Sequence, residues 1–195
     1  MIRVIIIGAA GRMGRRLVAN VMENPEFELA GATEFVESPF LGEDAGLVAG
    51  CGEAGVKITA NLEELVKHAD AIIDFATGGV MEAVRLAVEN HCAAVIGTTA
   101  LSAAEKGELA ELAERGGRIV SAYNMSVGVN LLFKLVGEAA RTLGPDYDVE
   151  IIEMHHNQKK DAPSGTAVRL AEEVCAARDW YYATDVRHGR EGMVG

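Results

Sequence analysis

A run of β-branched residues at the start of the chain leads directly into a glycine-rich turn, and this junction constrains the fold more than any other feature. Residues 2–7 predict a strand, and Gly8, Gly11 and Gly14 follow it in the pattern G-x-x-G-x-x-G. Apolar residues at positions 17, 18 and 21 then fall at helical spacing. Glycines so placed permit a tight turn, close approach of the backbone to a pyrophosphate, and close packing of helix on strand. A turn of this kind also has a plainer interpretation, in which the glycines serve packing alone.

An acidic residue after the second predicted strand favours the ligand-binding interpretation. Residues 27–33 predict that strand, and Glu34 follows it, 20 positions after Gly14. An acid at this distance is placed to accept hydrogen bonds from the ribose hydroxyls of a dinucleotide. The two features together predict a dinucleotide cofactor at the glycine turn.

Strands and helices alternate after an aperiodic segment at residues 35–55, which is rich in glycine and acid and which we predict to be an irregular loop. The alternation predicts βαβ units, and therefore an α/β fold with a doubly wound parallel sheet of the Rossmann type. The expected strands are 56–59, 70–75, 93–96 and 118–122, and the expected helices are 61–67, 79–90 and 102–115. Because ligands bind beyond the carboxyl ends of such strands, residues 75–77, 97–99 and 122–125 are expected to rim the nicotinamide.

A long helix is predicted over residues 126–143, and Gly144 with Pro145 ends it. The alternation stops contributing to the first sheet once this helix has crossed over. We therefore expect two domains. Residues 1–125 form a dinucleotide-binding Rossmann domain in this prediction, and residues 126–195 form a substrate-binding and catalytic domain.

The composition limits the classes of partner. A net charge of -11 argues against nucleic acid, because a phosphate backbone requires a basic surface. The 3 cysteines are widely spaced and outside any C-x-x-C pattern, which indicates neither a disulfide framework nor a thiolate metal site. The apolar start is too short for a signal peptide, and no apolar run reaches the ~18 residues of a membrane span. We therefore expect a soluble, cytoplasmic protein with no nucleic-acid or membrane partner.

The segment of residues 150–167 concentrates groups that can do chemistry. It contains two histidines, two lysines, three carboxylates and a Pro-Ser-Gly-Thr turn. Residues 149–155 predict a strand, at the end of which His155 and His156 point to opposite faces. His155 and Lys159 are the natural candidates for proton transfer.

A helix is predicted to begin after Ser164, because apolar residues recur at helical spacing in residues 167–174 and serine is a common N-cap. The backbone N–H groups at such a helix start attract anions. With His156, Lys159 and Lys160 nearby, the segment suits a substrate that carries carboxylates. The plainer interpretation is a solvated surface turn before an ordinary helix cap, and spacing alone leaves both open.

Two other chemistries fit this segment poorly. Adjacent strand histidines diverge and the sequence contains no H-E-x-x-H helix, which argues against a zinc site. Ser164 lacks the G-x-S-x-G elbow of a serine hydrolase. We therefore expect neither a metal nor a serine nucleophile.

The run from His155 to Ala167, H-H-x-x-K-x-D-A-P-S-G-T-A, resembles the signature of the 4-hydroxy-tetrahydrodipicolinate reductases, also called dihydrodipicolinate reductases. Three further blocks match motifs of this family in the same order, namely Gly8–Gly14, Gly97–Thr99 and Asn124–Asn130. The resemblance implies reduction of the cyclic product of dihydrodipicolinate synthase, a small dicarboxylate, with NADH or NADPH in the diaminopimelate route to lysine. It also implies an α+β second domain and a cytoplasmic homotetramer.

The same resemblance implies roles for individual residues. His155 looks like the family's proton donor or acceptor, and Lys159 like its catalytic proton donor. His156, Gly165 and Thr166 look like ligands of the substrate carboxylates. The positions that look like cofactor contacts are Gly8, Ala9, Ala10, Gly11, Arg12, Met13, Glu34, Gly97, Thr98, Thr99, Ala122, Tyr123, Asn124 and Met125.

The chain departs from the family pattern at two places. Phe35 follows Glu34 where an arginine would be the obvious partner for the phosphate of NADP, so we expect NADH to bind at least as well as NADPH. Family members continue well beyond the position of Gly195, and residues 183–186 predict a strand with no partner after it. We therefore expect the second domain to be incomplete here, and the working protein to continue with strands that close its sheet and mediate assembly.

Two alternative functions remain open. One is a related Rossmann oxidoreductase that acts on another small carboxylate, and the other is a non-catalytic module that only holds NADH or NADPH. A module that merely binds a cofactor has no need of the cluster from His155 to Thr166. That cluster favours the reductase.

Overall fold

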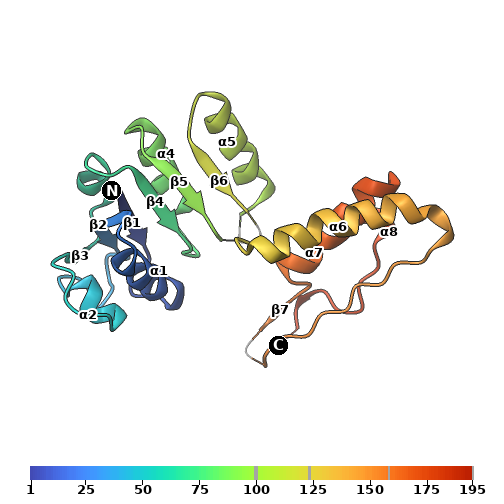
Figure 1. Ribbon diagram of the computed structural model, residues 1–195, viewed down its shortest axis with the longest axis horizontal. Coiled ribbons are helices and arrows are strands. Elements are labelled where there is room, and N and C mark those ends of the chain that lie inside the picture. The colour runs from blue at the N-terminus through green and yellow to red at the C-terminus, as the bar shows by residue number, and fades with distance from the viewer. Residues whose placement is uncertain (99–100, 123, 158, 195) are drawn as a thin grey trace. The chain divides into compact units, whose positions relative to one another are not determined.

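The computed structural model describes residues 1–98, 101–122, 124–157 and 159–194 (Figure 1). The chain divides into two compact units, Met1–Ala122 and Tyr123–Gly195. Each unit has its own helices and its own sheet. Within the described ranges, no helix has the length and apolar content needed to cross a membrane.

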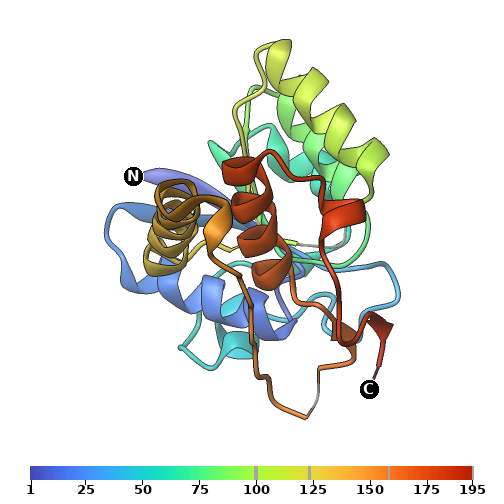
Figure 2. The ribbon, with the colours of Figure 1, turned by 90° about the vertical axis from the view of Figure 1, so that its right-hand side faces the viewer.

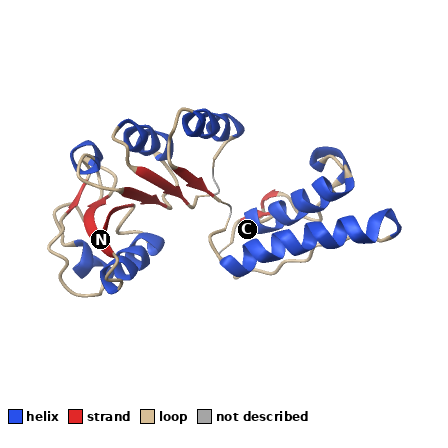
Figure 3. Cartoon of the chain, turned by 45° about the horizontal axis from the view of Figure 1, so that its top comes forward, coloured by secondary structure: helices blue, strands red, loops and turns tan. Residues whose placement is uncertain are grey.

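A parallel sheet of six strands forms the centre of the first unit, in the order β3-β2-β1-β4-β5-β6 (Figure 3). Its strands are β1 (Ile2–Ile7), β2 (Phe27–Thr33), β3 (Ile58–Thr59), β4 (Ala71–Asp74), β5 (Ala93–Ile96) and β6 (Ile119–Ser121). The strand order reverses at β1, which pairs with both β2 and β4. Doubly wound sheets bind ligands at such a switch point. The predicted Rossmann-type sheet is confirmed.

Helices cover both faces of this sheet because its strands are apolar on both faces. The helices are α1 (Arg12–Glu23), α2 (Ala45–Ala49), α3 (Leu62–Val66), α4 (Val80–Glu89) and α5 (Ala103–Glu114). On one face, Ile6 of β1 packs in a cluster with Val18 of α1. On the other, Ile72 of β4 packs in a cluster with Val84 of α4 and Leu109 of α5. The last two helices lie side by side (Figure 2).

The predicted irregular loop at residues 35–55 contains a helix, so that prediction is wrong in part. Helix α2 has five residues and lies in a segment rich in glycine and acid, where the sequence shows no helical period. The carboxylate of Asp44 caps it by accepting hydrogen bonds from the N–H groups of Gly46 and Leu47, at 2.9 and 3.0 Å. The same carboxylate oxygen accepts from Ala54 at 2.9 Å and so ties the far end of the loop to the helix start.

Two long helices pack side by side in the second unit, α6 (Val127–Leu143) and α7 (Gly165–Arg178). Its other elements are a 3₁₀ turn (Gly144–Asp146), the short helix α8 (Tyr182–Asp185), and the antiparallel strands β7 (Asp161–Ala162) and β8 (Gly192–Met193). The predicted cap at Ser164 is confirmed, because its hydroxyl accepts from Ala167 N–H. The Ser126 hydroxyl caps α6 in the same way by accepting from Val129 N–H.

The strand predicted over residues 149–155 is wrong, because residues 148–156 belong to no strand or helix. The carbonyl of Tyr147 accepts a hydrogen bond from Arg178 at the end of α7, and Glu153 binds Ser164 at its start. A helix of 14 residues is about 21 Å long, and six extended residue steps cover about 20 Å. The segment therefore runs the length of α7. Bonds to the two ends of this helix fix the segment, and no neighbouring strand is needed.

The strand predicted over residues 183–186 is also wrong. Tyr182–Asp185 forms helix α8, and the Asp185 carboxylate accepts a hydrogen bond from Tyr181 N–H at 2.7 Å. A local bond from side chain to backbone favours a helical turn over an extended strand. A pattern of four residues in the sequence does not show whether such a bond will form.

Candidate active site and cofactor site

The glycine turn between β1 and α1 has a shape that larger residues do not permit. Gly8 has a φ of +68°, and a Cβ added to Gly14 would lie 2.0 Å from the Gly8 carbonyl oxygen. Gly11 is the N-cap of α1, and among the residues described no side chain caps that helix. Open N–H donors and the helix dipole suit a phosphate group. The turn is a cradle that added side chains would fill.

The carboxylate of Glu34 lies against this turn. One of its oxygens accepts a hydrogen bond from Ala10 N–H at 2.9 Å. Phe35, the next residue, is 62% exposed and brings no charge to this place. Arg12 and Met13, the first residues of α1, are exposed as well. The acid predicted to contact the ribose is therefore fixed beside the predicted pyrophosphate site.

The other predicted cofactor segments of the first unit follow the carboxyl ends of β4, β5 and β6. Gly97 donates its N–H to the Asp74 carbonyl at 2.9 Å, and Ala122 donates to the Ile96 carbonyl at 3.3 Å. The ring of Phe75 lies so close to Gly97 that an added Cβ would meet it at 2.1 Å. Thr98 belongs to the same edge of the sheet.

Four other predicted cofactor contacts either lie outside the described residues or belong to the second unit. Thr99 and Tyr123 lie outside the described residues. Asn124 and Met125 belong to the second unit, where the Asn124 side chain donates a hydrogen bond to the Thr166 hydroxyl at 3.4 Å and accepts one from Ser126 N–H at 2.9 Å. Asn124 is therefore fixed next to the start of α7.

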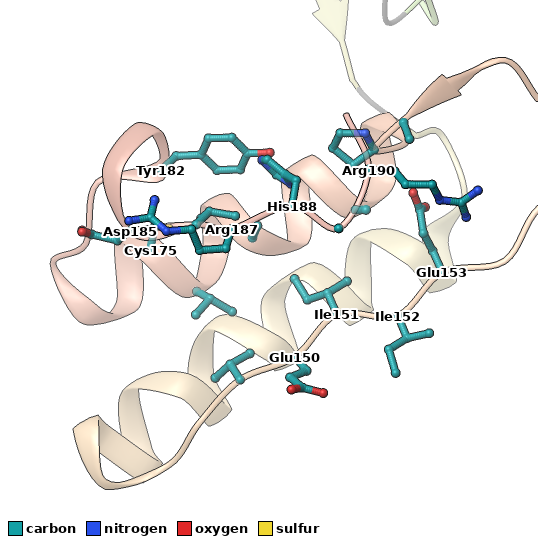
Figure 4. A pocket seen from close by; sticks show the side chains of 18 of the residues that line it. Glu150, Ile151, Ile152, Glu153, Cys175, Tyr182, Asp185, Arg187, His188 and Arg190 are labelled. Atoms are coloured by element: carbon teal, nitrogen blue, oxygen red, sulfur yellow. The ribbon is translucent and has the colours of Figure 1, made fainter. Parts of the chain in front are cut away.

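The second unit contains an open pocket of about 1330 Å³ (Figure 4). The extended segment with Glu150 and Ile152 runs along one side, and His188 and Arg190 lie on the segment across from it. One face of α7 contributes residues at helical spacing to the lining, namely Ala167, Ala171, Val174, Cys175 and Arg178. His155, His156 and Lys159 also line it. Three of the predicted site residues therefore share one pocket.

Glu153 connects the histidine segment to the start of α7. Its carboxylate accepts hydrogen bonds from the N–H of Ser164, at 2.8 Å, and from the Ser164 hydroxyl. Partial burial raises the pKa of Glu153, but these bonds and the nearby charges of His155 and Lys159 lower it overall. The carboxylate therefore stays ionised at neutral pH.

The two histidines are closer to each other than a strand would place them. Their ring centroids are 6.4 Å apart in an edge-to-face arrangement, so the prediction that they diverge to opposite faces is wrong. The two histidines belong to no strand, so no sheet fixes their side chains on opposite faces. The Nδ1 atom of His155 lies 3.7 Å from a Glu153 carboxylate oxygen. That carboxylate is therefore close enough to orient the ring.

Lys159 is held by an acid two residues away. Its Nζ atom donates to the Asp161 carboxylate at 2.8 Å, and its side chain is 19% exposed. This ammonium group lowers the pKa of Asp161, first through the hydrogen bond and also through its charge. The bond to Asp161 holds the Lys159 side chain at the edge of the pocket.

Gly165 and Thr166 form the first turn of α7, directly after Ser164. The N–H groups of a first turn have no acceptor within the helix, so they are directed beyond its start. Ser164 is 5% exposed and is fixed on both sides by its bonds to Glu153 and Ala167. The helix start is thus rigid and carries donors suited to a carboxylate.

Sequence reasoning assigned no role to Glu153, Asp161 or Asp74. A signal for Glu153 was present, because it is an acid two residues before His155 in the sequence. Asp161 is only two residues from the lysine that it holds. Asp74 ends a strand that is otherwise apolar. Across the residues that the structure describes, no group of three or more histidine, cysteine or acidic side chains is placed to hold a metal ion.

Comparisons with known proteins agree with one another. Family models described as "Dihydrodipicolinate reductase, N-terminus" and "Dihydrodipicolinate reductase, C-terminus" match residues 2–125 and 128–193. The 4-hydroxy-tetrahydrodipicolinate reductase of Syntrophotalea carbinolica is 46% identical over 196 residues, which cover 100% of this chain and 73% of the relative. That of Methylocella silvestris is 45% identical over 194 residues, which cover 99% of this chain and 71% of the relative.

Solved structures give the same result for the fold. A dipicolinate-bound dihydrodipicolinate reductase from a Paenisporosarcina species aligns with a TM-score of 0.71 and 33% identity, over 98% of this chain and 71% of that one. A scyllo-inositol dehydrogenase from Lactobacillus casei with bound NAD(H) and scyllo-inositol aligns with a TM-score of 0.54 and 17% identity, over 71% of this chain and 42% of that one. The second likeness concerns the fold alone.

Proposed function

Because the chain belongs to the dihydrodipicolinate reductase family, we propose that it reduces 4-hydroxy-tetrahydrodipicolinate to tetrahydrodipicolinate with NADH or NADPH, in the diaminopimelate route to lysine. The observation that carries the proposal is the clustering of His155, His156 and Lys159 in one pocket, in a chain that is 46% identical to such a reductase. The two compact units support a division of labour in which residues 1–125 bind the cofactor and residues 126–195 bind the substrate.

The glycine turn is the proposed site of the cofactor pyrophosphate. The cradle at Gly8 and Gly14 and the uncapped start of α1 fit a phosphate, so Gly8, Ala9, Ala10, Gly11, Arg12 and Met13 would hold this part of the cofactor. Glu34 would accept hydrogen bonds from the adenine ribose. The nicotinamide half would lie against Gly97, Thr98, Thr99, Ala122, Tyr123, Asn124 and Met125. When bound, the reduced nicotinamide supplies the hydride.

Lys159 and His155 are the proposed proton-transfer groups. Addition of a hydride to an unsaturated ring carbon builds negative charge, which a proton must quench. The Lys159 ammonium carries that proton, and its bond to Asp161 holds it in place until the substrate arrives. His155 donates or accepts a proton beside it, and Glu153 orients its ring.

His156, Gly165 and Thr166 are the proposed ligands of the substrate carboxylates. The first-turn N–H groups of α7 and the helix dipole favour an anion there. Ser164 and Glu153 lock the helix start, so these donors are positioned before the substrate binds. The negative charge of Glu153 is balanced by Lys159, His155 and the helix dipole.

NADH is proposed to bind at least as well as NADPH. The Glu34 carboxylate, held by Ala10 N–H, would repel a 2′-phosphate, and the exposed Phe35 offers no cation to bind one. Arg12 is the cation proposed to offset this repulsion. The opposing charges of Glu34 and Arg12, beside the uncharged Phe35, decide the preference between NADH and NADPH.

We propose that the working protein is a cytoplasmic homotetramer. Val127, Leu131 and Leu135 of α6 are 85%, 55% and 52% exposed, and their spacing of four residues places them on one side of the helix. An apolar stripe of this kind is typical of a protein interface. Light scattering of the purified protein measures the mass of the assembly.

The function is tested by following the oxidation of NADH and NADPH with freshly generated product of dihydrodipicolinate synthase. We expect oxidation that depends on that substrate and on the protein. Cofactor binding without oxidation would favour the non-catalytic module. Oxidation with other small carboxylates but not with this substrate would favour a related oxidoreductase.

A further inference from the structure

Asp74 is an acidic residue in apolar surroundings. It is the last residue of β4 and is 0% exposed, and it is the most deeply buried acidic or basic side chain among the residues described. Its partners in register on the neighbouring strands are Ile7 and Ile96. No ion pair to Asp74 is found in the described part of the chain. Burial of an unpaired acid costs free energy, so the stability of the sheet does not explain this side chain.

Only half of the Asp74 carboxyl group is satisfied. The Oδ1 atom accepts a hydrogen bond from Ala76 N–H at 2.7 Å, and the Oδ2 atom is buried without a hydrogen-bond partner among the described groups. Burial raises the pKa of Asp74, and the bond from Ala76 lowers it by less. A carboxyl group that is protonated on Oδ2 still accepts from Ala76 through Oδ1.

The bond from Ala76 closes a turn that lies between the two glycine segments of the proposed cofactor site. A Cβ added to Gly8 would lie 3.4 Å from the Cβ of Ala76. A Cβ added to Gly97 would lie 2.1 Å from the ring of Phe75. The turn of residues 75–76 is thus in close contact with the ends of both β1 and β5. Its position sets the space between the pyrophosphate cradle and the Gly97 segment.

We propose that Asp74 is a positioning residue of the cofactor site, whose buried carboxyl group holds the Phe75–Ala76 turn between the Gly8 and Gly97 segments. This inference rests on the proposed function, because it concerns the same cofactor. Asp74 acts through the turn and takes no part in the transfer of the hydride or the proton. Loss of its acceptor lets the turn move, and the two glycine segments then lose their fixed spacing.

The test compares Asp74→Ala and Asp74→Leu, which remove the acceptor, with Asp74→Asn, which retains one. The cofactor KM, kcat, the cofactor dissociation constant by NADH fluorescence, and the melting temperature are measured for each. We expect the first two variants to raise the cofactor KM and dissociation constant about tenfold or more, with a smaller change in kcat. Asp74→Asn should stay within about threefold of wild type, because its side-chain oxygen can still bind Ala76 N–H.

Asp70→Asn is the matched control, since Asp70 precedes the same strand at the opposite edge of the sheet and binds Arg3 through a salt bridge of 3.0 Å. It should alter the melting temperature but not the cofactor KM. Asp74→Leu removes the buried acid, so it keeps the test decisive if Asp74→Ala does not fold. If Asp74→Ala or Asp74→Leu folds and its cofactor KM stays within twofold of wild type, the inference is wrong and the proposed function is unaffected. Failure of wild type to bind NADH or NADPH would overturn the proposed function and the inference with it.

Discussion

The carboxylate of Glu153 accepts hydrogen bonds from both the backbone N–H and the hydroxyl of Ser164, the residue that caps α7. One acid thus connects the extended segment that carries His155 to the helix start that is proposed to bind the substrate. Because Nδ1 of His155 lies 3.7 Å from the same carboxylate, a change at Glu153 should affect both parts of the site.

Replacement of Glu153 by alanine should therefore lower kcat about tenfold, because His155 and the α7 start lose their common anchor. Glu153→Gln keeps the length of the side chain and should lose less. The pH dependence of stability adds a second measurement. The folded-state pKa of Glu153 lies below its ordinary value of 4.5, so its stabilising effect is present above that pH and is lost as the pH falls through the folded pKa. The difference in melting temperature between wild type and Glu153→Gln should shrink on acidification, and a constant difference would contradict the role of the charge.

His155→Ala and Lys159→Ala should each lower turnover about a hundredfold or more, as the loss of a positioned proton donor does. The dissociation constant of the cofactor should change little. Lys160→Ala is the comparison, because it removes a neighbouring exposed positive charge that is not a proposed proton donor, and it should lower turnover far less. Near-normal rates in the His155 and Lys159 variants would refute the proposed roles.

Wild-type protein should bind NADH at least as tightly as NADPH, as titration of both by fluorescence will measure. Phe35→Arg should shift the preference toward NADPH, because it places a cation where the 2′-phosphate would lie. Arg12→Ala tests the competing source of charge. A clear NADPH preference in wild type that disappears in Arg12→Ala would show that Arg12 replaces the absent arginine.

Gly14→Ala should weaken cofactor binding about tenfold or more and lower the melting temperature. Its Cβ would lie 2.0 Å from the Gly8 carbonyl oxygen, and a backbone atom at that distance yields only if the whole turn shifts. Gly107→Ala is the matched control inside α5, where an added Cβ meets nothing within 4 Å. That variant should gain up to about 1 kcal/mol of stability and bind the cofactor normally. Equal cofactor affinities and melting temperatures in the two variants would refute the close contact at Gly14.

Asp74→Asn should become more stable relative to wild type as the pH rises. Burial raises the folded-state pKa of Asp74 above its ordinary value of 3.8, so wild type is progressively destabilised as the pH rises from that value through the folded pKa. Asparagine does not titrate and avoids this loss. Thermal melts of both proteins from acidic to neutral pH measure the difference, which should widen and then become constant.

Much of the first unit follows from the sequence because its signals are local. The β-branched run predicts β1 with the bounds Ile2–Ile7, and Ser102 caps α5 with a reciprocal bond from Glu105. Such features depend on residues within a few positions of one another. The helix α2 was missed because it lies in a segment rich in glycine and acid that shows no helical period.

The candidate site was predictable as a set of residues but not as an arrangement. The run from His155 to Ala167 identified the family, and the spacing of glycines with Glu34 predicted the cofactor. The pairs Glu153–Ser164 and Asn124–Thr166 join residues 11 and 42 positions apart, which no local pattern reports. The role proposed for Asp74 likewise depends on contacts of its turn with Gly8 and Gly97.

By itself, the sequence determined most strands and helices of the first unit, where its turns contain glycine, and the family to which the chain belongs. Only the tertiary structure decided what residues 149–155 bind, because an extended segment becomes a strand only when a second backbone satisfies its N–H and C=O groups. Here the anchors are side chains, Arg178 at one end of α7 and Glu153 reaching Ser164 at the other. Those partners are distant in the sequence and meet only after α7 has formed and folded back, so no local pattern of apolar residues specifies them.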